Sequence, residues 1–354
     1  MQEHLADIVE PLMKWFETNK RELPWRADRQ PYHIWISEIM LQQTRIEAVK
    51  KYYEKFMKEL PDVESLSLIS EEKLLKLWEG LGYYSRAKNL KKAAEMIMQE
   101  YDGAFPDSYE QLLKLPGIGE YTAGAIASIC FNEKVTAVDG NVLRVISRVL
   151  GSKKNVLLPE TKKAITQKLT EMIPEQSGIF NEALMELGEI ICLPNGTPEC
   201  QRCPIQSNCI SYKEHLTAEI PVRIKKLKRK KAEKTVLLLI TDDHRIAIEK
   251  RTEKGLLSGM YQLPNVDGFY TEEELPLLLQ ECQLTAAETS FIKNAKHTFT
   301  HIDWYMKGYL VTVREKCSRF LWVSPQELSE QYPLPTAFQT FTKNLFQSRF
   351  LGNH

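Results

Sequence analysis

The stretch LPGIGEYTAGAIASI, residues 115–129, predicts a tight turn between two helices. SYEQLLKL, residues 108–115, leads into the turn, and the helix that follows is rich in small residues. Gly117 and Gly119 let the backbone approach a partner closely, and a helix N-terminus offers free N–H groups to an anion. A plain helical hairpin explains the same residues, so the turn alone does not decide the function.

Two acids elsewhere in the chain need an explanation. Asp139, in AVDGNVLRV (137–145), is placed to cap the helix that begins at GNVLRVI. Glu38, in PYHIWISEIMLQQTR (31–45), lies among residues that would line the buried stripe of a helix. An ionised carboxylate is costly to bury without partners, so Glu38 is unusual for a core position.

The composition is that of a globular protein with two or three domains: 354 residues, 43% hydrophobic and 27% charged. No run approaches the length of a membrane span, and the N-terminus lacks the pattern of a signal peptide. We therefore expect no membrane association and a cytoplasmic protein.

Charge and periodicity divide the chain. Residues 1–222 hold 27 basic and 32 acidic residues and show helical spacing throughout, whereas 223–234, RIKKLKRKKAEK, hold 8 and 1. From residue 235 the pattern becomes β-rich, with a hairpin expected at Asp242-Asp243-His244. We predict a mainly α domain at 1–222, a basic linker at 223–234 that could also touch phosphate, and an α+β domain at 235–354.

Asp107, in FPDSYEQLL, is expected to cap a helix.

Four of the seven cysteines fall in CLPNGTPECQRCPIQSNC, residues 192–209. In a cytosolic chain such a cluster favours a metal site over disulfides. Zinc usually takes its thiolates from two separated knuckles, and four thiolates from one compact loop suit an iron–sulfur cluster better. Zinc remains the alternative. The predicted ligands are Cys192, Cys200, Cys203 and Cys209.

These motifs together resemble those of the helix-hairpin-helix DNA glycosylases that carry an iron–sulfur cluster. SEIMLQQT (37–44), GLGYYSRAKNL (80–90) and HTFTH (297–301) narrow the resemblance to the MutY-type adenine DNA glycosylases. The resemblance implies a helical glycosylase core of two lobes with a 4Fe–4S loop at 192–209, joined to a Nudix-like domain. It also implies removal of adenine opposite 8-oxoguanine or guanine in duplex DNA, with the base flipped into a pocket.

The resemblance gives the two acids a chemistry. Glu38 matches the family's general acid, which protonates N7 of adenine, and apolar surroundings raise a carboxyl pKa for that task. Asp139 matches the carboxylate that stabilises the oxocarbenium-like sugar. Tyr121 stands where bifunctional relatives place a Schiff-base lysine, so a monofunctional enzyme is implied. Asn141 is similar to a family residue near the two carboxylates.

DNA handling follows from the same resemblance. Gln42 and Gln43 match residues inserted into the duplex, with Gln43 as the wedge. Tyr83 matches the aromatic residue that stacks beside 8-oxoguanine. Gly117 and Gly119 would contact the DNA backbone, and Arg26 and Arg86 would contact the pocket or phosphate.

The C-terminal domain is expected to read a base and not to hydrolyse nucleotides. RTEKGLLSGMYQLPNVDG (251–268) resembles the opening of a Nudix core, but the glutamates of the magnesium-binding box do not follow. The loop Phe299-Thr300-His301 would recognise 8-oxoguanine, with Thr300 where the family commonly has Ser.

The cysteine loop departs from the family. Seven residues separate Cys192 from Cys200, where six are usual, and the loop lacks the basic residues often found there. This puts DNA contact by the loop in doubt.

Three alternatives remain: a glycosylase/lyase for oxidised pyrimidines, a non-catalytic DNA-damage binding protein, and a nucleotide hydrolase. We expect a monomer whose partner is double-stranded DNA containing adenine opposite 8-oxoguanine or guanine. The resemblance also implies a bacterial-type, cytoplasmic protein that is associated with the nucleoid when it acts on DNA.

Overall fold

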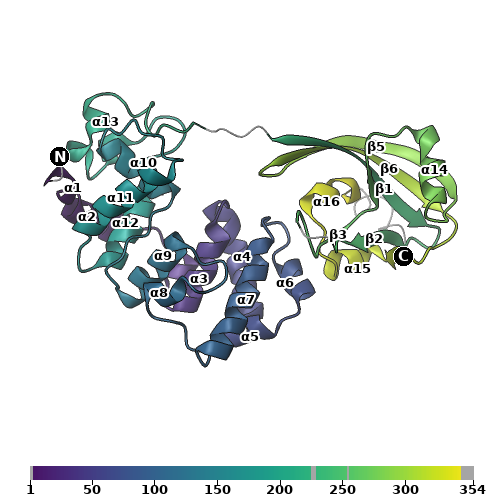
Figure 1. Cartoon of the computed structure of the whole chain (residues 1–354), viewed down its shortest axis with the longest axis horizontal. Coiled ribbons are helices and arrows are strands. Elements are labelled where there is room, and N and C mark those ends of the chain that lie inside the picture. Colours follow the sequence, from purple (N-terminus) through teal and green to yellow (C-terminus); the bar gives the residue numbers. More distant parts are fainter. Residues whose placement is uncertain (1–2, 225–228, 253–254, 344–354) are drawn as a thin grey trace. The chain divides into compact units, whose positions relative to one another are not determined.

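The structure, a computed structural model, describes residues 3–224, 229–252 and 255–343. These residues form two compact units. The helical unit comprises the described residues of Met1–Leu68 and Asn89–Lys226, and the sheet unit those of Ile69–Lys88 and Leu227–His354. Figure 1 shows the helices of the first and the strands of the second. No helix in the described ranges is long and apolar enough to cross a membrane.

The helical unit is built from short and medium helices joined by tight turns. Its elements are α1 (Glu3–Ala6), α2 (Val9–Asn19), η1 (Pro24–Arg26), α3 (Pro31–Leu41), α4 (Ile46–Glu59), α5 (Val63–Leu68), most of α7 (Ser85–Glu100), α8 (Tyr109–Leu112), α9 (Glu120–Phe131), α10 (Gly140–Val149), α11 (Pro159–Met172), α12 (Ser177–Ile190), η2 (Cys200–Arg202), η3 (Gln206–Asn208) and α13 (Ile210–Lys213).

Two helices, α3 and α9, are buried on nearly every side. Both are apolar around most of their circumference, which is the pattern of a helix enclosed by others. α9 packs on α3 and on α12, while α2, α10, α11 and α12 share one hydrophobic core. The two helical lobes expected from the sequence thus meet along α9 (Figure 1).

Close packing against α9 fixes the position of residues 135–137, the segment that leads to Asp139. A Cβ at Gly124 of α9 would overlap the carbonyl oxygen of Thr136. On α12, the buried Asn181 donates its amide to the Val135 carbonyl at 2.9 Å and accepts the Ala137 N–H at 3.1 Å. Because a buried amide with satisfied partners holds one geometry, residues 135–137 are fixed from both sides.

The sheet unit contains a mixed sheet in the order β3-β2-β1-β6-β5, with β4 on β1 and β7 on β2. The central pair, β1 and β6, is parallel, with Lys230 opposite Ile302 and Thr241 opposite Val313. The elements are α6 (Glu71–Leu77), β1 (Lys230–Thr241), β2 (Ile246–Lys250), β3 (Tyr261–Gln262), β4 (Asn265–Asp267), η4 (Glu272–Glu274), α14 (Leu275–Gln280), β5 (Ala286–Thr298), β6 (Ile302–Val313), β7 (Leu321–Val323), α15 (Pro325–Glu330) and α16 (Thr336–Thr342).

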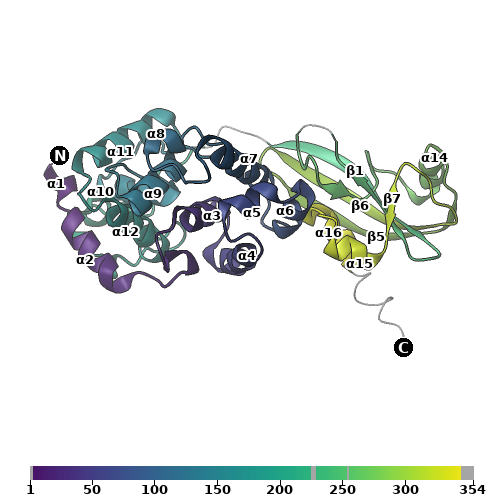
Figure 2. The same ribbon diagram turned by 90° about the horizontal axis from the view of Figure 1, so that it is seen from below.

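Alternation along β1 supplies a core on each face of the sheet. Val236, Leu238 and Ile240 face one core, which includes residues of α15 and α16, and Leu237 and Leu239 face the other with α14. Figure 2 shows α15 and α16 lying against the sheet. Because successive residues of β1 are buried on opposite faces of the sheet, the strand appears in the sequence as a continuous apolar run.

Several sequence predictions can be compared with these elements. The hairpin at 242–244 is confirmed, because β1 and β2 are antiparallel with Ile240 opposite Ile246. The cap predicted at Asp107 is wrong: Ser108 is the N-cap of α8, and its hydroxyl accepts the N–H of Gln111.

The basic run and residues 69–88 also differ from expectation. The strand β1 begins at Lys230, inside the linker predicted at 223–234, since pairing with β6 extends the strand; residues 225–228 lie outside the described ranges. Residues 69–88, expected within the domain at 1–222, group with the C-terminal residues because α6 contacts them directly.

Candidate active site

A cleft of about 850 Å³ in the helical unit collects most of the predicted site residues. Its walls come from η1, α3, α9, α10 and α12, together with the turn after α3. The predicted residues that line it are Arg26, Glu38, Gln42, Gln43, Tyr121, Asp139 and Asn141. Residues as far apart in the chain as Arg26 and Asn141 are therefore brought to one place.

Glu38 is the buried acid of the cleft. Its side chain is on α3, the residue is 7% exposed, and its Oε2 accepts a hydrogen bond of 2.5 Å from the Tyr121 hydroxyl. Burial raises the pKa of Glu38 to about 7; the charges of Asp139 and Glu182 act in the same direction, while the Tyr121 hydrogen bond and Arg26 oppose it. The carboxyl can therefore hold and release a proton near neutral pH.

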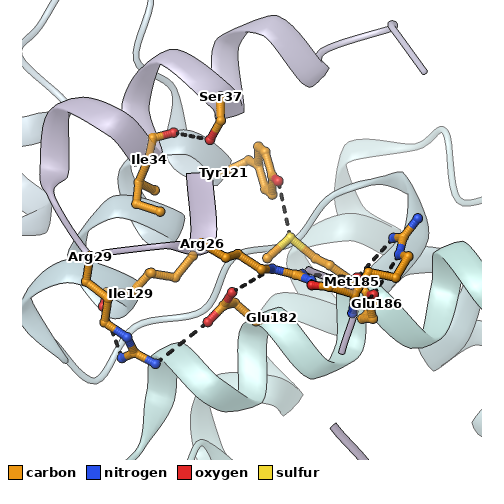
Figure 3. A network of polar contacts seen from close by, with 10 residues as sticks. Arg26, Arg29, Ile34, Ser37, Tyr121, Ile129, Glu182, Met185 and Glu186 are labelled. Carbon is orange, nitrogen blue, oxygen red and sulfur yellow. Dashed lines mark hydrogen bonds and ion pairs between the residues drawn. The ribbon is translucent and has the colours of Figure 1, made fainter. Parts of the chain in front are cut away.

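Tyr121, in the first turn of α9, is a hydrogen-bond donor in this arrangement. Burial and the nearby carboxylates raise the pKa of its hydroxyl well above the ordinary value, so the hydroxyl stays protonated. The hydroxyl also contacts the sulfur of Met185 at 3.2 Å (Figure 3). Tyrosine at this position orients the acid and offers no amine for a Schiff base.

Asp139 caps α10, as predicted. Its Oδ1 accepts the N–H groups of Asn141 at 2.9 Å and Val142 at 2.8 Å, and no hydrogen bond to Oδ2 is present within the described residues. Burial raises the pKa of Asp139, and the two backbone bonds act against that rise. The cap fixes the direction of a carboxylate at the edge of the cleft.

Asn141 and the two glutamines hold different places around the cleft. The Asn141 amide donates to Glu189 at 2.9 Å and its oxygen accepts from Arg144 at 2.9 Å, so it links α10 to α12. Gln42 donates to the Thr122 hydroxyl at 3.4 Å. Gln43 has φ of 62°, a left-handed conformation that is strained for a side chain of this size and often marks a functional turn.

A network of arginines and glutamates forms the far wall of the cleft. Arg26 donates to Glu182 at 3.1 Å and to Glu186 at 3.0 Å (Figure 3). The Arg21 side chain donates two further bonds to Glu186, at 2.7 and 3.0 Å. Burial raises the pKa of Glu182 despite its arginine neighbours. Arg26 therefore lies in the pocket, one of the two places predicted for it, and is held there by carboxylates.

The sequence reasoning missed part of this wall. The cleft is also lined by residues that were not predicted, among them Arg21, Trp25, Glu182, Met185, Glu186 and Glu189. A signal was available, because Glu182, Glu186 and Glu189 recur at helical spacing on one face of α12, beside apolar residues of the same helix. Acids on the buried face of a helix indicate a site or a charge network.

The helix-hairpin-helix turn has the predicted geometry. Gly117 has φ of 81°, and a Cβ there would approach Asn89 to 2.6 Å, so only glycine fits. Gly119 is the N-cap of α9, and a Cβ there would meet no atom within 4 Å. The N–H groups at the start of α9 thus stand next to an uncrowded surface that can accept a phosphate.

The four cysteines of the loop line one small apolar pocket, together with Arg148 and Tyr212. Arg148 donates to the Cys192 sulfur at 3.2 Å. Within the described ranges no group of three or more His, Cys, Asp or Glu residues is arranged to hold a single metal ion. The structure does bring the four predicted ligands together around one pocket.

The remaining predicted residues belong to the sheet unit. Thr300 and His301 are exposed between β5 and β6, and the Phe299 ring packs against His297 and Trp304. Tyr83 is half exposed on the turn after α6. Arg86, expected at the pocket or phosphate, is instead buried beneath that turn and donates to the carbonyls of Leu81 and Gly82 at 3.0 and 3.2 Å.

The chain matches two protein-family models and is similar to several known proteins. Residues 36–175 match the model of the HhH-GPD superfamily base excision DNA repair proteins, and residues 235–344 match a NUDIX domain. Adenine DNA glycosylase of Buchnera aphidicola (subspecies Baizongia pistaciae) is 33% identical over 87% of each chain. Adenine DNA glycosylase of Homo sapiens is 33% identical over 84% of this chain and 65% of its own.

Solved structures resemble the helical part. A thermostable thymine-DNA glycosylase is 31% identical, with a TM-score of 0.55, over 60% of this chain and 98% of its own. Endonuclease III in a non-covalent DNA complex has a TM-score of 0.52 over 61% of this chain and 98% of its own; at 24% identity it shows the shared fold.

We predict that Glu38 titrates near pH 7 and that Tyr121→Phe moves its pKa higher. The Tyr121 hydrogen bond stabilises the ionised carboxylate, so its loss favours the protonated form. Difference infrared spectroscopy would follow the protonated carboxyl band, and Glu38→Gln would identify that band. Titration of Glu38 near 4.5, the ordinary value, would contradict the burial argument.

Proposed function

The chain belongs to the adenine DNA glycosylases, enzymes that release adenine from DNA, and from this premise we propose that its substrate is adenine opposite 8-oxoguanine or guanine in duplex DNA. The observation that carries the proposal is the buried Glu38 carboxyl, which has a pKa of about 7 and a hydrogen bond from Tyr121. A base in a duplex is out of reach of such a group, so the adenine is flipped into the cleft.

The cleft walls suit a flipped adenine. Arg26 and Glu182 present a donor and an acceptor on one side, which complement the ring nitrogens and the exocyclic amine of adenine. Trp25 and Met185 supply apolar surface for the ring. Gln43 lies at the rim in a strained turn and fills the space that the flipped base leaves.

Bond cleavage needs an acid for the base and a negative charge for the sugar. Protonated Glu38 gives its proton to N7 of adenine, which makes the base a better leaving group. The Asp139 carboxylate, oriented by the α10 N-terminus, then stabilises the positive charge on the sugar. Water then adds to the anomeric carbon of the sugar and loses a proton, which leaves adenine and an abasic sugar as the products. Tyr121 is not an amine and forms no covalent bond to the sugar, so the strand stays intact.

Recognition of the opposite base is assigned to the sheet unit. The Tyr83 ring is exposed and can stack on a base, a contact worth about 1–3 kcal/mol. The Thr300 hydroxyl can hydrogen-bond the edge of 8-oxoguanine, since Thr300 is exposed at the tip of the β5–β6 turn.

The cysteine pocket is assigned a 4Fe–4S cluster. Cys192, Cys200, Cys203 and Cys209 would hold it, and when bound it would cross-link the loop after α12. Arg148 holds this loop independently, through the Cys192 sulfur and the Leu193 carbonyl, the latter at 2.9 Å.

Single-turnover release of adenine tests the proposal directly. We expect fast release opposite 8-oxoguanine, slower release opposite guanine and little opposite thymine, with strand breaks only after alkali. Glu38→Gln should slow release about 10²–10⁴-fold while duplex binding remains. Because the protonated form of Glu38 is the active one, the rate should fall as pH rises through 7. The mechanism also needs Asp139 as a carboxylate, and burial raises the pKa of Asp139, so the rate should fall again in acid as Asp139 takes up a proton.

Two results would refute parts of this scheme. Strand cleavage before alkali would favour a glycosylase/lyase, and unchanged release by Glu38→Gln would remove Glu38 as the acid.

Two substitutions, Thr300→Ala and Thr300→Ser, test whether the β5–β6 turn recognises 8-oxoguanine. We expect Thr300→Ala to lower the preference for 8-oxoguanine over guanine about threefold to tenfold, the value of one hydrogen bond, and Thr300→Ser to keep it. The ratio of the two release rates is the measurement. Equal ratios in all three proteins would exclude Thr300 as a reader.

Metal analysis of the purified protein tests the cluster. We expect about four irons and equal acid-labile sulfide per chain, lost together in Cys203→Ser. The matched control is Cys282→Ser, which alters a half-buried cysteine of the sheet unit. One zinc per chain without iron would overturn the assignment.

A further inference from the structure

The short helix α6 is built into the sheet unit, although it precedes that unit's strands by about 150 residues in the chain. Lys76 donates to the carbonyls of Leu328 and Tyr332 at 3.3 and 3.2 Å. The Glu79 carboxylate accepts the Leu334 N–H at 2.8 Å and the Gln339 amide at 3.1 Å. Hydrogen bonds to an ionised group are the stronger kind, so these contacts tie α6 to the segment 328–339.

A second set of contacts lies at the start of the same helix. Glu72 accepts from the Lys250 ammonium at 2.7 Å and the Tyr261 hydroxyl at 2.9 Å, and these bonds hold the pKa of Glu72 below its usual value. Glu71 pairs with Lys88 at 2.7 Å, and a Cβ at Gly259 would approach both side chains of that pair within 3 Å. Contacts at both ends of α6 leave it little freedom to rotate or slide.

The end of α6 is also the base of the Tyr83 turn. Trp78, the C-cap of α6, donates its indole N–H to the Gly82 carbonyl at 3.1 Å. The Arg86 guanidinium lies over the Trp78 ring at 5.2 Å and the Tyr83 ring at 5.7 Å, and it donates to the carbonyls of Leu81 and Gly82. Gly82 and Tyr83 have φ of 68° and 47°, so the turn is a fixed left-handed one.

We propose that α6 is the support through which the C-terminal sheet domain positions Tyr83, with Glu79, Lys76 and Glu72 as positioning residues for reading the base opposite adenine. This inference rests on the proposed function, which gives Tyr83 a base to stack on. An exposed aromatic ring discriminates between bases only when its position is defined, because a loose ring follows whatever base is present. The same domain thus carries one reading element, Thr300, and holds a second, Tyr83.

A double-mutant cycle on Glu79 and Tyr83 tests the proposal in the full-length protein. The readout is the ratio of single-turnover adenine release rates opposite 8-oxoguanine and opposite guanine. We expect Glu79→Ala to lower the ratio about threefold to tenfold in the parent and to have no further effect in Tyr83→Ala, because it acts through Tyr83. Glu79→Gln keeps an oxygen for the Leu334 N–H and should restore most of the ratio.

Two controls separate positioning from general damage. Glu95→Ala removes the comparable partner of Lys91 on α7, in the helical unit, and should leave the ratio unchanged. If Glu79→Ala folds poorly, Lys76→Met provides a second cycle with Tyr83, because it keeps the side-chain stem and removes the bonds to Leu328 and Tyr332 together with the ion pair to Glu79.

The outcomes are distinct. An unchanged ratio in Glu79→Ala and Lys76→Met, or an equal fall with and without Tyr83, would overturn the positioning role while leaving the proposed function intact. A parent protein that shows no preference for 8-oxoguanine would instead refute the proposed substrate. An unchanged ratio in Tyr83→Ala would remove Tyr83 as a reader and the positioning role with it.

Discussion

The burial of the Glu38 carboxyl beneath the Tyr121 hydroxyl is the constraint on which the helical unit depends. Burial alone would leave a carboxyl protonated and inert, and full solvation would leave it ionised. The hydrogen bond from Tyr121 opposes part of the burial effect, so the pKa of Glu38 remains at about 7. That balance requires α3 and α9 to pack closely and in a fixed register, which their apolar circumferences and the small residues of α9 allow.

The same packing sets the position of Asp139. Gly124 brings α9 against the carbonyl of Thr136, and Asn181 of α12 fixes Val135 and Ala137 from the other side. The chain therefore reaches Asp139 in one conformation, and the α10 N–H groups orient its carboxylate. One helix, α9, carries the donor to the acid and helps to place the second carboxylate.

Local sequence patterns predicted the site residues that lie in short motifs. They did not predict features that depend on contacts between segments far apart in the chain. Glu38, Tyr121, Asp139 and the four cysteines lie in motifs, and the cleft and the cysteine pocket collect them. Glu182 and Glu186 were missed because their partners, Arg21 and Arg26, lie more than 150 positions away. The strand start at Lys230 depends on β6, which no reading of the basic run alone reveals. In the sequence, residues 69–88 have the pattern of an ordinary helical segment. Their place in the sheet unit follows only from the contacts of Lys76 and Glu79 with segment 328–339.

Ion pairs in the cleft reduce the repulsion that the net-negative helical part would otherwise exert on a polyanion such as DNA. The cleft contains Glu182 and Glu186, whose charge would repel phosphate if it were unpaired, and Arg21 and Arg26 neutralise them. These arginines are engaged by carboxylates. Under the proposed function, we expect the N–H groups at the start of α9, beyond Gly117 and Gly119, to contribute phosphate binding that needs no net charge. Such groups bind any backbone equally, so discrimination between duplexes must come from the cleft and from the residues that contact the opposite base.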